Sequence, residues 1–541
     1  MRVSHRRINF LSWFLAGCVS PLLLVGAFAA EQPAGGAEKL GTVRFAISCN
    51  DLAKTNFTRA ITLVHSFYFV EVQKALMDAA KADPDCAMVH WAFAMAAMEN
   101  PYTWPLTGKS LGVGLAASER ARQLGGKTER ERDYIAAVDY FFRDADKVPA
   151  QTRQLAYELA MAKLADKYPD DTEARIFYAL ALSANYDPND KSYRNQLRAA
   201  QMLEPILVEQ PNHPGVSHYL IHCYDSPPLA QRGLASAYRY RDVAPSAPHA
   251  LHMPSHTFTR LGMWNDSIAA NTAVINATKD VRSKLHSWDY MGYAYLQKAQ
   301  DDDARRVLTE IQALRKIEGE NIAAAYALAA IPARMALERQ QWGEAAALTL
   351  PISELDFAWQ QFPHAEAVVV YARALGAARS GKINAAQKDL ARLGALKTAM
   401  LEAKQFYWAD QSDIQREAVT AWLAYAHKDK DAVHLMRAAA DHEDGTEKSA
   451  VTPGPIIPVR EQLADLLMLL KQPRDALVEY EKGIIKEPNR FRSLFGAARA
   501  AEVVKDEKAA EKYYRLLVAS ANSPQGAHPE VKRAVAYLAG R

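Results

Sequence analysis

Residues 473–488 read PRDALVEYEKGIIKEP, and residues 507–524 read EKAAEKYYRLLVASANSP. Ala476 and Tyr480 of the first stretch recur 34 residues later as Ala510 and Tyr514, and each stretch ends on a proline. A small residue followed four positions later by an aromatic one suits the contact between two crossing helices, and the proline suits the link to the next helix. The two stretches therefore predict pairs of helices that repeat about every 34 residues.

The same frame returns along most of the chain. It is visible in residues 79–84, 199–211, 262–267 and 341–345. Between these points apolar residues recur at helical spacing and alanine is abundant, with no convincing alternating strand pattern. The period is that of the tetratricopeptide repeat (TPR), a helix pair that buries its apolar face by stacking on its neighbours. We expect an all-α, TPR-type α-solenoid that is continuous over residues 43–541, with irregular segments at about 101–130 and 440–458.

The N-terminus has the features of a secretory signal. Three arginines precede an apolar run over residues 10–29, which ends in a small-x-small cleavage sequence. We predict a signal peptide at residues 1–29, a flexible segment at 30–42, and export to the periplasm. An uncleaved anchor helix is the alternative, and Pro21 argues against it. A lipid anchor on Cys18 is less favoured, because the apolar stretch continues well past that cysteine.

The charges balance once the predicted signal is removed. The whole chain has 65 Lys plus Arg against 62 Asp plus Glu, and three of the arginines lie in the signal. A neutral chain without a basic stripe lacks the electrostatic footprint of a nucleic-acid-binding protein. No other apolar segment approaches the length of a membrane-spanning helix. We therefore expect no nucleic-acid partner and no transmembrane helix in the mature chain.

The cysteines outside the signal give one candidate disulfide. Cys49 and Cys86 flank the first expected helices, and an oxidising compartment permits a bond between them, although sequence alone does not fix their geometry. Cys223 is then left over beside His222. We expect Cys223 to be a small, buried apolar residue, and a soft metal ligand is the alternative.

Histidines are concentrated in the middle repeats, about residues 212–300. Six of the 15 histidines fall between His213 and His256, where uniform scatter would place about one. In TPR proteins, repeat positions 2, 5, 9 and 12 face the concave groove, and the resemblance to TPRs implies the same here. The periodic frame places at these positions His218, His222 and Asp225 of one repeat, His249, His252 and His256 of the next, His286, Asp289 and Tyr293 of the third, and Arg334 of the fourth.

A transition-metal site is the chemistry that this pattern favours. Two histidines four residues apart share one helix face, and neighbouring helices lie about 8–10 Å apart, so imidazoles from both can converge on one ion. Neutral imidazole suits zinc, copper or iron. We predict His218, His222, His249, His252 and His256 as metal ligands, and a pair of ions is conceivable. The residues expected to orient these ligands through hydrogen bonds, or to contact a substrate, are Asp225, His286, Asp289, Tyr293 and Arg334.

Several features of the sequence leave other interpretations of the histidine cluster open. The chain has no HExxH sequence around these histidines, so the usual metalloprotease base is missing. Histidines in a TPR groove can also bind a peptide or a carboxylate without any metal. Pro254 would kink a helix that carried His249, His252 and His256 together, and if it opens a helix, the first two belong to the preceding loop. We expect His213 to be a turn residue. The histidines expected to be ordinary core or surface residues are His65, His90, His364, His427, His434, His442 and His528.

The chain resembles a group of exported bacterial TPR proteins. The matching strings are residues 49, 65–67, 83–88, 212–225, 247–262, 289–297 and 451–455. They span most of the mature chain, and the histidine-rich strings are more specific than a generic TPR. The resemblance implies the fold and export and no particular activity.

Two classes of function follow. The leading hypothesis is an exported TPR protein that binds a transition metal in its groove, as a metal-dependent hydrolase or oxidoreductase acting on a small-molecule or peptide ligand. Reversible metal capture or delivery is a variant of it. The competing hypothesis is a non-enzymatic TPR scaffold for a protein or peptide partner, which would bind that partner equally well after chelation.

Overall fold

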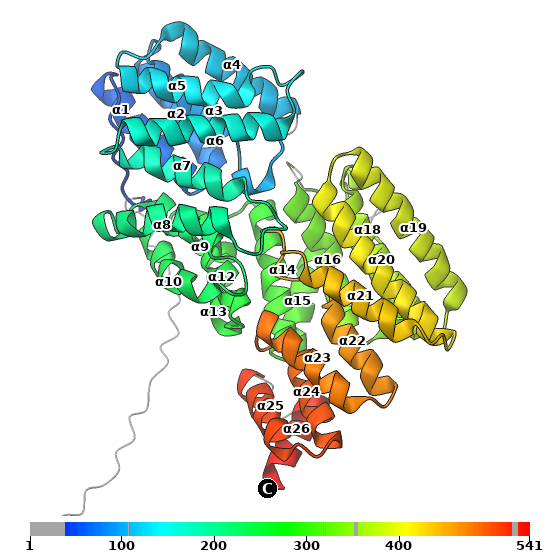
Figure 1. Cartoon of the computed structure of the whole chain (residues 1–541). Helices are drawn as coiled ribbons and strands as arrows, with labels where there is room; N and C mark the ends of the chain where they lie inside the picture. Colours follow the sequence, from blue (N-terminus) through cyan, green and yellow to red (C-terminus); the bar gives the residue numbers. More distant parts are fainter. Residues whose placement is uncertain are drawn as a thin grey trace, which may run out of the picture. The chain divides into compact units, whose positions relative to one another are not determined.

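The computed structural model describes residues 38–106, 108–317, 319, 321–350, 355–521 and 528–540 (Figure 1). The predicted signal peptide lies outside these residues. The predicted flexible segment at 30–42 is described from Glu38, and this part is packed: Leu40 is buried, the Thr42 N–H donates to the Asn212 carbonyl (2.9 Å), and the Lys39 N–H donates to Ser246 (2.9 Å). These hydrogen bonds fix residues 38–42 on the middle repeats.

The described chain is built from α-helices. In chain order they are α1 (Asp51–His65), α2 (Phe69–Ala82), α3 (Ala87–Ala97), α4 (Gly108–Leu124), α5 (Glu129–Phe142), α6 (Ala150–Lys167), α7 (Thr172–Ala184), α8 (Arg194–Glu209), α9 (Pro214–Cys223), α10 (Leu234–Val243), α11 (Pro248–His252), α12 (Pro254–Arg260), α13 (Trp264–Ala277), α14 (Val281–Gln297), α15 (Asp301–Gln312), α16 (Ile322–Glu338), α17 (Trp342–Ala345), α18 (Pro363–Arg379), α19 (Ile383–Glu402), α20 (Phe406–Ala426), α21 (Ala432–Asp444), α22 (Val459–Leu469), α23 (Pro473–Lys486), α24 (Phe491–Val503), α25 (Glu507–Ser520) and α26 (Pro529–Ala539). Short 3₁₀ turns are η1 (Pro101–Thr103), η2 (Ala230–Gly233) and η3 (Trp359–Gln361).

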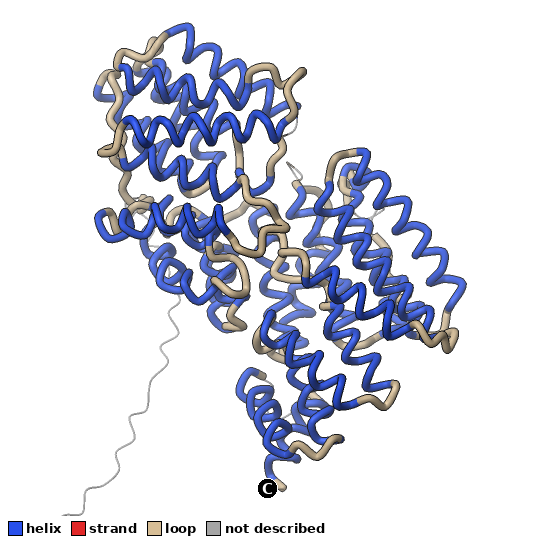
Figure 2. Tube along the Cα trace, viewed as in Figure 1, coloured by secondary structure: helices blue, strands red, loops and turns tan. Residues whose placement is uncertain are grey.

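Helices that are consecutive in the chain pack as hairpins, which stack on one another (Figures 1 and 2). The predicted contact is present in the pair formed by α23 and α24. Ala476 is fully buried and Tyr480 is 2% exposed, and a Cβ on Gly496 of α24 would lie 2.2 Å from the Tyr480 ring. The aromatic ring of one helix therefore occupies the space left by the glycine of the next, as the 34-residue period requires.

These hairpins make the described chain an all-α, TPR-type α-solenoid. No strand occurs among the described residues, where the only bridge joins Lys316 and Asp356. None of the helices in the described ranges is long and apolar enough to cross a membrane. Cys49 and Cys86 are joined by a disulfide with a Cα–Cα distance of 5.6 Å, which lies in the usual range for such bonds.

The two segments expected to be irregular differ from the prediction. Residues 108–124 form helix α4, because packing against α3 and α5 overrides the weak helix propensity of the glycines at 108, 112 and 114. The loop expected at 440–458 begins only after α21 ends at Asp444, and it runs to the start of α22. Residues 451–454 of this loop are buried.

Candidate metal centre

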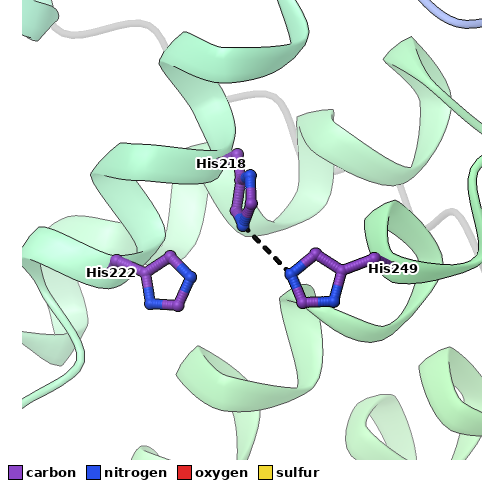
Figure 3. Close-up of side chains that lie close together, drawn as sticks. All are labelled: His218, His222 and His249. Atoms are coloured by element: carbon purple, nitrogen blue, oxygen red, sulfur yellow. Dashed lines mark hydrogen bonds between the residues drawn. The ribbon is translucent and has the colours of Figure 1, made fainter. Parts of the chain in front are cut away.

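Four helices of the middle repeats bring six histidines together in two groups of three. Within each group the ligand atoms lie within 4.8 Å of one another. We call these groups triad one (His218, His222 and His249) and triad two (His252, His256 and His286). The helices that carry them are α9, α11, α12 and α14, and Figure 3 shows the rings of triad one turned toward one another.

Local sequence explains how α9 carries two members of triad one. Pro214 opens the helix and His213 caps it by accepting the Val216 N–H on Nδ1, so His213 is a turn residue as predicted. A Cβ at Gly215 would lie 2.5 Å from Nδ1 of His65, so only glycine lets α9 approach α1 this closely. His218 then faces the end of α1.

Triad one contains a fixed imidazole and an unpartnered ring nitrogen. His218 donates from Nδ1 to the backbone oxygen of His65 (2.7 Å), which leaves its Nε2 without a proton in the neutral ring. That Nε2 lies 3.1 Å from Nε2 of His249 (Figure 3). The buried Nε2 of His222 has no hydrogen-bond partner among the described residues.

Triad two is held more tightly from outside. His252 donates from Nδ1 to Oδ1 of Asn271 (2.7 Å), and the amide of Asn271 is oriented by its own bond to the Ser267 carbonyl (2.8 Å). His256 donates from Nδ1 to Asp225 (2.9 Å). The buried Nδ1 of His286 has no hydrogen-bond partner in the described part of the chain.

These hydrogen bonds determine what the other nitrogens of triad two can do. The Nε2 atoms of His252 and His256 are 3.1 Å apart, and both carry a lone pair because each ring keeps its proton on Nδ1. The hydroxyl of Tyr290 lies 3.3 Å from His256 Nε2 and 3.3 Å from the Thr452 carbonyl, and its single proton can serve only one of them. Two buried lone pairs that face one another repel unless a cation lies between them.

Burial keeps the cluster in the neutral form that binds metals. Desolvation lowers the pKa of all six imidazoles, and in His256 the neighbouring Asp225 opposes this effect. The two triads also adjoin. Ring centroids of His222 and His256 are 5.9 Å apart, and those of His249 and His252 are 6.1 Å apart. One ion in each triad would therefore make a neighbouring pair.

Asp225 is the carboxylate beside the cluster. It accepts from His256, from Nε of Arg260 (2.9 Å) and from Nζ of Lys448 (2.9 Å). Burial opposes its ionisation, but Lys448 and Arg260 hold its pKa well below the usual range. In turn, burial lowers the pKa of Lys448 to about 8. Asp225 thus orients the ring of His256 through this hydrogen bond.

Three of the other predicted accessory residues, Asp289, Tyr293 and Arg334, are hydrogen-bonded to partners other than the histidines. Asp289 pairs with Arg334, and burial raises its pKa to about 6 against the effect of that arginine. Arg334 also donates to Thr452 Oγ1 and to the Gly454 carbonyl (2.9 Å each), so it fixes the loop after α21. Tyr293 accepts from Arg490 and donates to Glu487. No hydrogen bond in the described residues joins Asp289, Tyr293 or Arg334 to a histidine.

The ring of His286 lies in triad two, whereas the sequence predicted that it would support the ligands or contact a substrate. The sequence does indicate this position, since His286 has the same repeat position as His249, which was predicted to be a ligand. Pro254 is the first residue of α12, and His249 and His252 lie on the short helix α11 rather than in a loop. Met253 between the two helices has helical backbone angles, so the proline interrupts the hydrogen bonding while the chain continues in nearly the same direction.

A third group, His65, Glu173 and His213, was missed by the sequence argument, which treated these histidines separately. Glu173 accepts from Nε2 of His65 (3.0 Å) and of His213 (2.9 Å). The remaining nitrogen of His65 accepts from Tyr219 (2.9 Å), and that of His213 accepts from a backbone N–H. Every ring nitrogen is therefore partnered, and the group is a buried support behind His218 rather than a vacant ligand set.

Comparisons with known proteins add only distant likenesses. No protein-family model and no curated protein matches the chain. Among solved structures, yeast Tom70 is similar over 90% of this chain and 89% of that one, with 12% identity and a TM-score of 0.30. Naa15/Naa10 bound to HypK matches over 90% of this chain and 74% of that one (11% identity, TM-score 0.25). A monomeric mutant of IFIT1 with Gppp-AAAA matches over 87% and 95% (11% identity, TM-score 0.34). Likenesses of this degree bear on neither the ligand nor the activity of this chain.

Proposed function

We propose that this chain binds a pair of transition-metal ions, one in triad one and one in triad two. The observation that carries the proposal is the contact between Nε2 of His252 and Nε2 of His256, where two lone pairs meet at 3.1 Å in a buried position. The unpartnered nitrogens of His222 and His286 support it, because each triad then has a free donor atom. Outer hydrogen bonds that fix the Nδ1 proton and turn Nε2 inward are the usual arrangement around metal-bound histidine.

Copper fits this donor set better than zinc or iron. The ligands are six neutral imidazoles, and the nearest carboxylate, Asp225, is already balanced by Arg260 and Lys448. Each added ion therefore brings uncompensated charge into a buried site, and a monovalent ion costs least. Copper is the imidazole-binding metal of the three with an accessible monovalent state.

An oxidoreductase is the favoured activity. Three protein ligands for each ion leave a position open, which is typical of catalytic rather than closed structural sites. Hydrolysis would also need a base, and in the described chain the carboxylate that reaches the cluster is held by two cations. We therefore favour oxidation chemistry on a small molecule. We also infer export to the periplasm from the N-terminal sequence, and the disulfide of Cys49 and Cys86 supports this inference.

The test is elemental analysis of the purified mature chain after loading with Cu(I), Zn(II) or Fe(II). We expect close to two ions per chain, none in the double variant His218→Ala/His252→Ala, and about one in either His222→Ala or His286→Ala. The control is His427→Ala, which removes an exposed histidine at the end of α20 and should keep both ions. Circular dichroism confirms that each variant is folded.

A folded parent that holds no ion after loading would refute the proposal, and the groove would then be read as a binding surface for a protein or peptide. Retention of both ions by the double variant would place the metal elsewhere. Loss of both ions from each single variant would show one shared site in place of a pair.

A further inference from the structure

A cavity with aromatic walls lies beside triad two. It is partly open to solvent and lies between α16, α18, α20 and the loop after α21. Its aromatic lining comes from Tyr326, Tyr371, Tyr407 and Trp408, and the rings of Tyr326 and Trp408 are 5.4 Å apart. An aromatic lining of this kind is suited to a ring-containing small molecule.

Two buried hydrogen-bond acceptors in the lining have no partner. His364 is 2% exposed and lies next to the carbonyl of Ile322, which is 3.4 Å from its Nε2 and can only accept. The ring proton therefore belongs on Nε2, and Nδ1 carries a lone pair that no described residue satisfies. Oε1 of Gln415, also in the lining, is likewise unpartnered within the described residues. Buried acceptors left in this state favour a ligand that donates hydrogen bonds.

The charged side chains in the cavity lining do not require a charged ligand. Arg260 and Lys448 in the lining are paired with Asp225. Burial raises the pKa of Glu443 to about 7, and Lys486, also in the lining, opposes this shift. A neutral molecule would therefore enter without leaving an ion unpaired.

Two residues in the lining connect the cavity to the surroundings of triad two. Lys448 lines the cavity and donates to Asp225, which holds the ring of His256. Thr452 lines the cavity, and its carbonyl accepts from Tyr290, whose ring lies 5.1 Å from that of His256. An occupant of the cavity would thus be linked to the His256 ring through Lys448 and Asp225, and through Thr452 and Tyr290.

We propose that this cavity binds a neutral aromatic molecule that carries a hydroxyl or amino hydrogen-bond donor, a phenol-like ligand. Aromatic walls bind the ring, and Nδ1 of His364 and Oε1 of Gln415 accept its hydrogen bonds. Resting on the proposed function, this ligand is also the substrate class of the metal pair. Binding to the cavity does not itself need the metal, so the two proposals can fail separately.

The first experiment uses the full mature chain after chelation and two probes, 2-naphthol and its methyl ether, which lacks the donor. Calorimetric titration should show saturable 1:1 binding of 2-naphthol and at least about tenfold weaker binding of the ether, the effect of one lost hydrogen bond to a buried acceptor. In His364→Phe the difference between the two probes should shrink, since one of the two acceptors is gone while a ring remains. The matched control His427→Phe, with the same substitution at an exposed site, should keep the difference.

Equal binding of the two probes to the parent, or no saturable binding of 2-naphthol, would overturn the inference. Binding by a chain that takes up no metal would uphold the cavity and refute the metal proposal, and the reverse pattern would do the opposite. In the copper(II)-loaded parent we expect the NMR lines of bound 2-naphthol to broaden. Lines as sharp as those with the His218→Ala/His252→Ala variant would refute the link between cavity and metal.

Discussion

Asp225 shows how one residue can orient a histidine of the proposed metal site without itself being a ligand. Its carboxylate accepts from the ring of His256 and from two cations, Arg260 and Lys448. Because a carboxylate can only accept, His256 must keep its proton on Nδ1 and present a bare Nε2 to triad two. The two cations keep Asp225 ionised, so this tautomer does not depend on small changes around it.

Replacing Asp225 by asparagine should weaken metal binding at triad two alone. The amide nitrogen of the introduced side chain would compete with its oxygen for the position behind His256, and when it donates, the ring proton moves to Nε2 and blocks the ligand atom. We expect affinity at triad two to fall about 10–100-fold with triad one unchanged, measured by competition with a chelator of known affinity. The exposed Asp242→Asn serves as control. Equal loss at both triads, or at neither, would contradict the role given to Asp225.

The repeat register predicted which histidines share a face, but it could not predict their hydrogen-bond partners. The resemblance to TPR proteins assigns positions 2, 5 and 9 to one face, so His218 and His252 could be singled out without a structure. Their partners could not, because the carbonyl of His65 lies 153 residues from His218 in sequence, and no periodicity relates the two. The network of Glu173 was missed for the same reason, as its histidines come from separate helices 108 and 40 residues away.

Among the elements, the loop after α21 has the largest role for its length. It was predicted as an irregular segment, but its burial was not, since a loop is ordinarily at the surface. Arg334 holds it through Thr452 and Gly454, and the side chain of Glu443 from α21 accepts the Val459 N–H (2.7 Å) where α22 begins. The loop thereby lines the cavity and contacts Asp225 and Tyr290, the residues beside His256.

The helix start capped by Glu443 should make stability depend on pH. Burial raises the pKa of Glu443 from 4.5 to about 7, so between these values the folded chain retains a proton that the unfolded chain releases. Stability is then lost as pH rises through this window, by roughly 3 kcal/mol across it. In Glu443→Gln this contribution should vanish, so that the difference in unfolding free energy between parent and variant changes with pH from 4.5 to 7 in urea titrations. A pH-independent difference would show that Glu443 is ionised throughout.

At the scale of the whole described array, the repeats are not joined only to their sequence neighbours. Trp264 donates to the carbonyl of Asn489 (3.0 Å), and the Phe491 N–H donates to the side chain of Gln297 (3.0 Å). Helix α24 thus contacts α14, about 200 residues earlier in the chain. A simple TPR array unfolds repeat by repeat because each repeat contacts only its neighbours, whereas these bonds link the middle repeats, including the histidine cluster, to the C-terminal ones.

Arg490 is the centre of this connection, and its removal should divide the unfolding transition. Its guanidinium is 1% exposed and donates to Tyr293 (2.8 Å), Glu338 (2.8 Å) and Glu461 (3.2 Å). Arg490→Met leaves two buried carboxylates without their cation, a loss of about 3–5 kcal/mol. We expect calorimetry to show the C-terminal repeats melting before the middle ones, in place of their joint transition in the parent. Arg515→Met, which removes an exposed arginine of α25 paired with Glu511, should leave the parent transition intact. If Arg490→Met lowers the melting temperature but keeps one transition, neighbour-to-neighbour stacking alone must hold the array together.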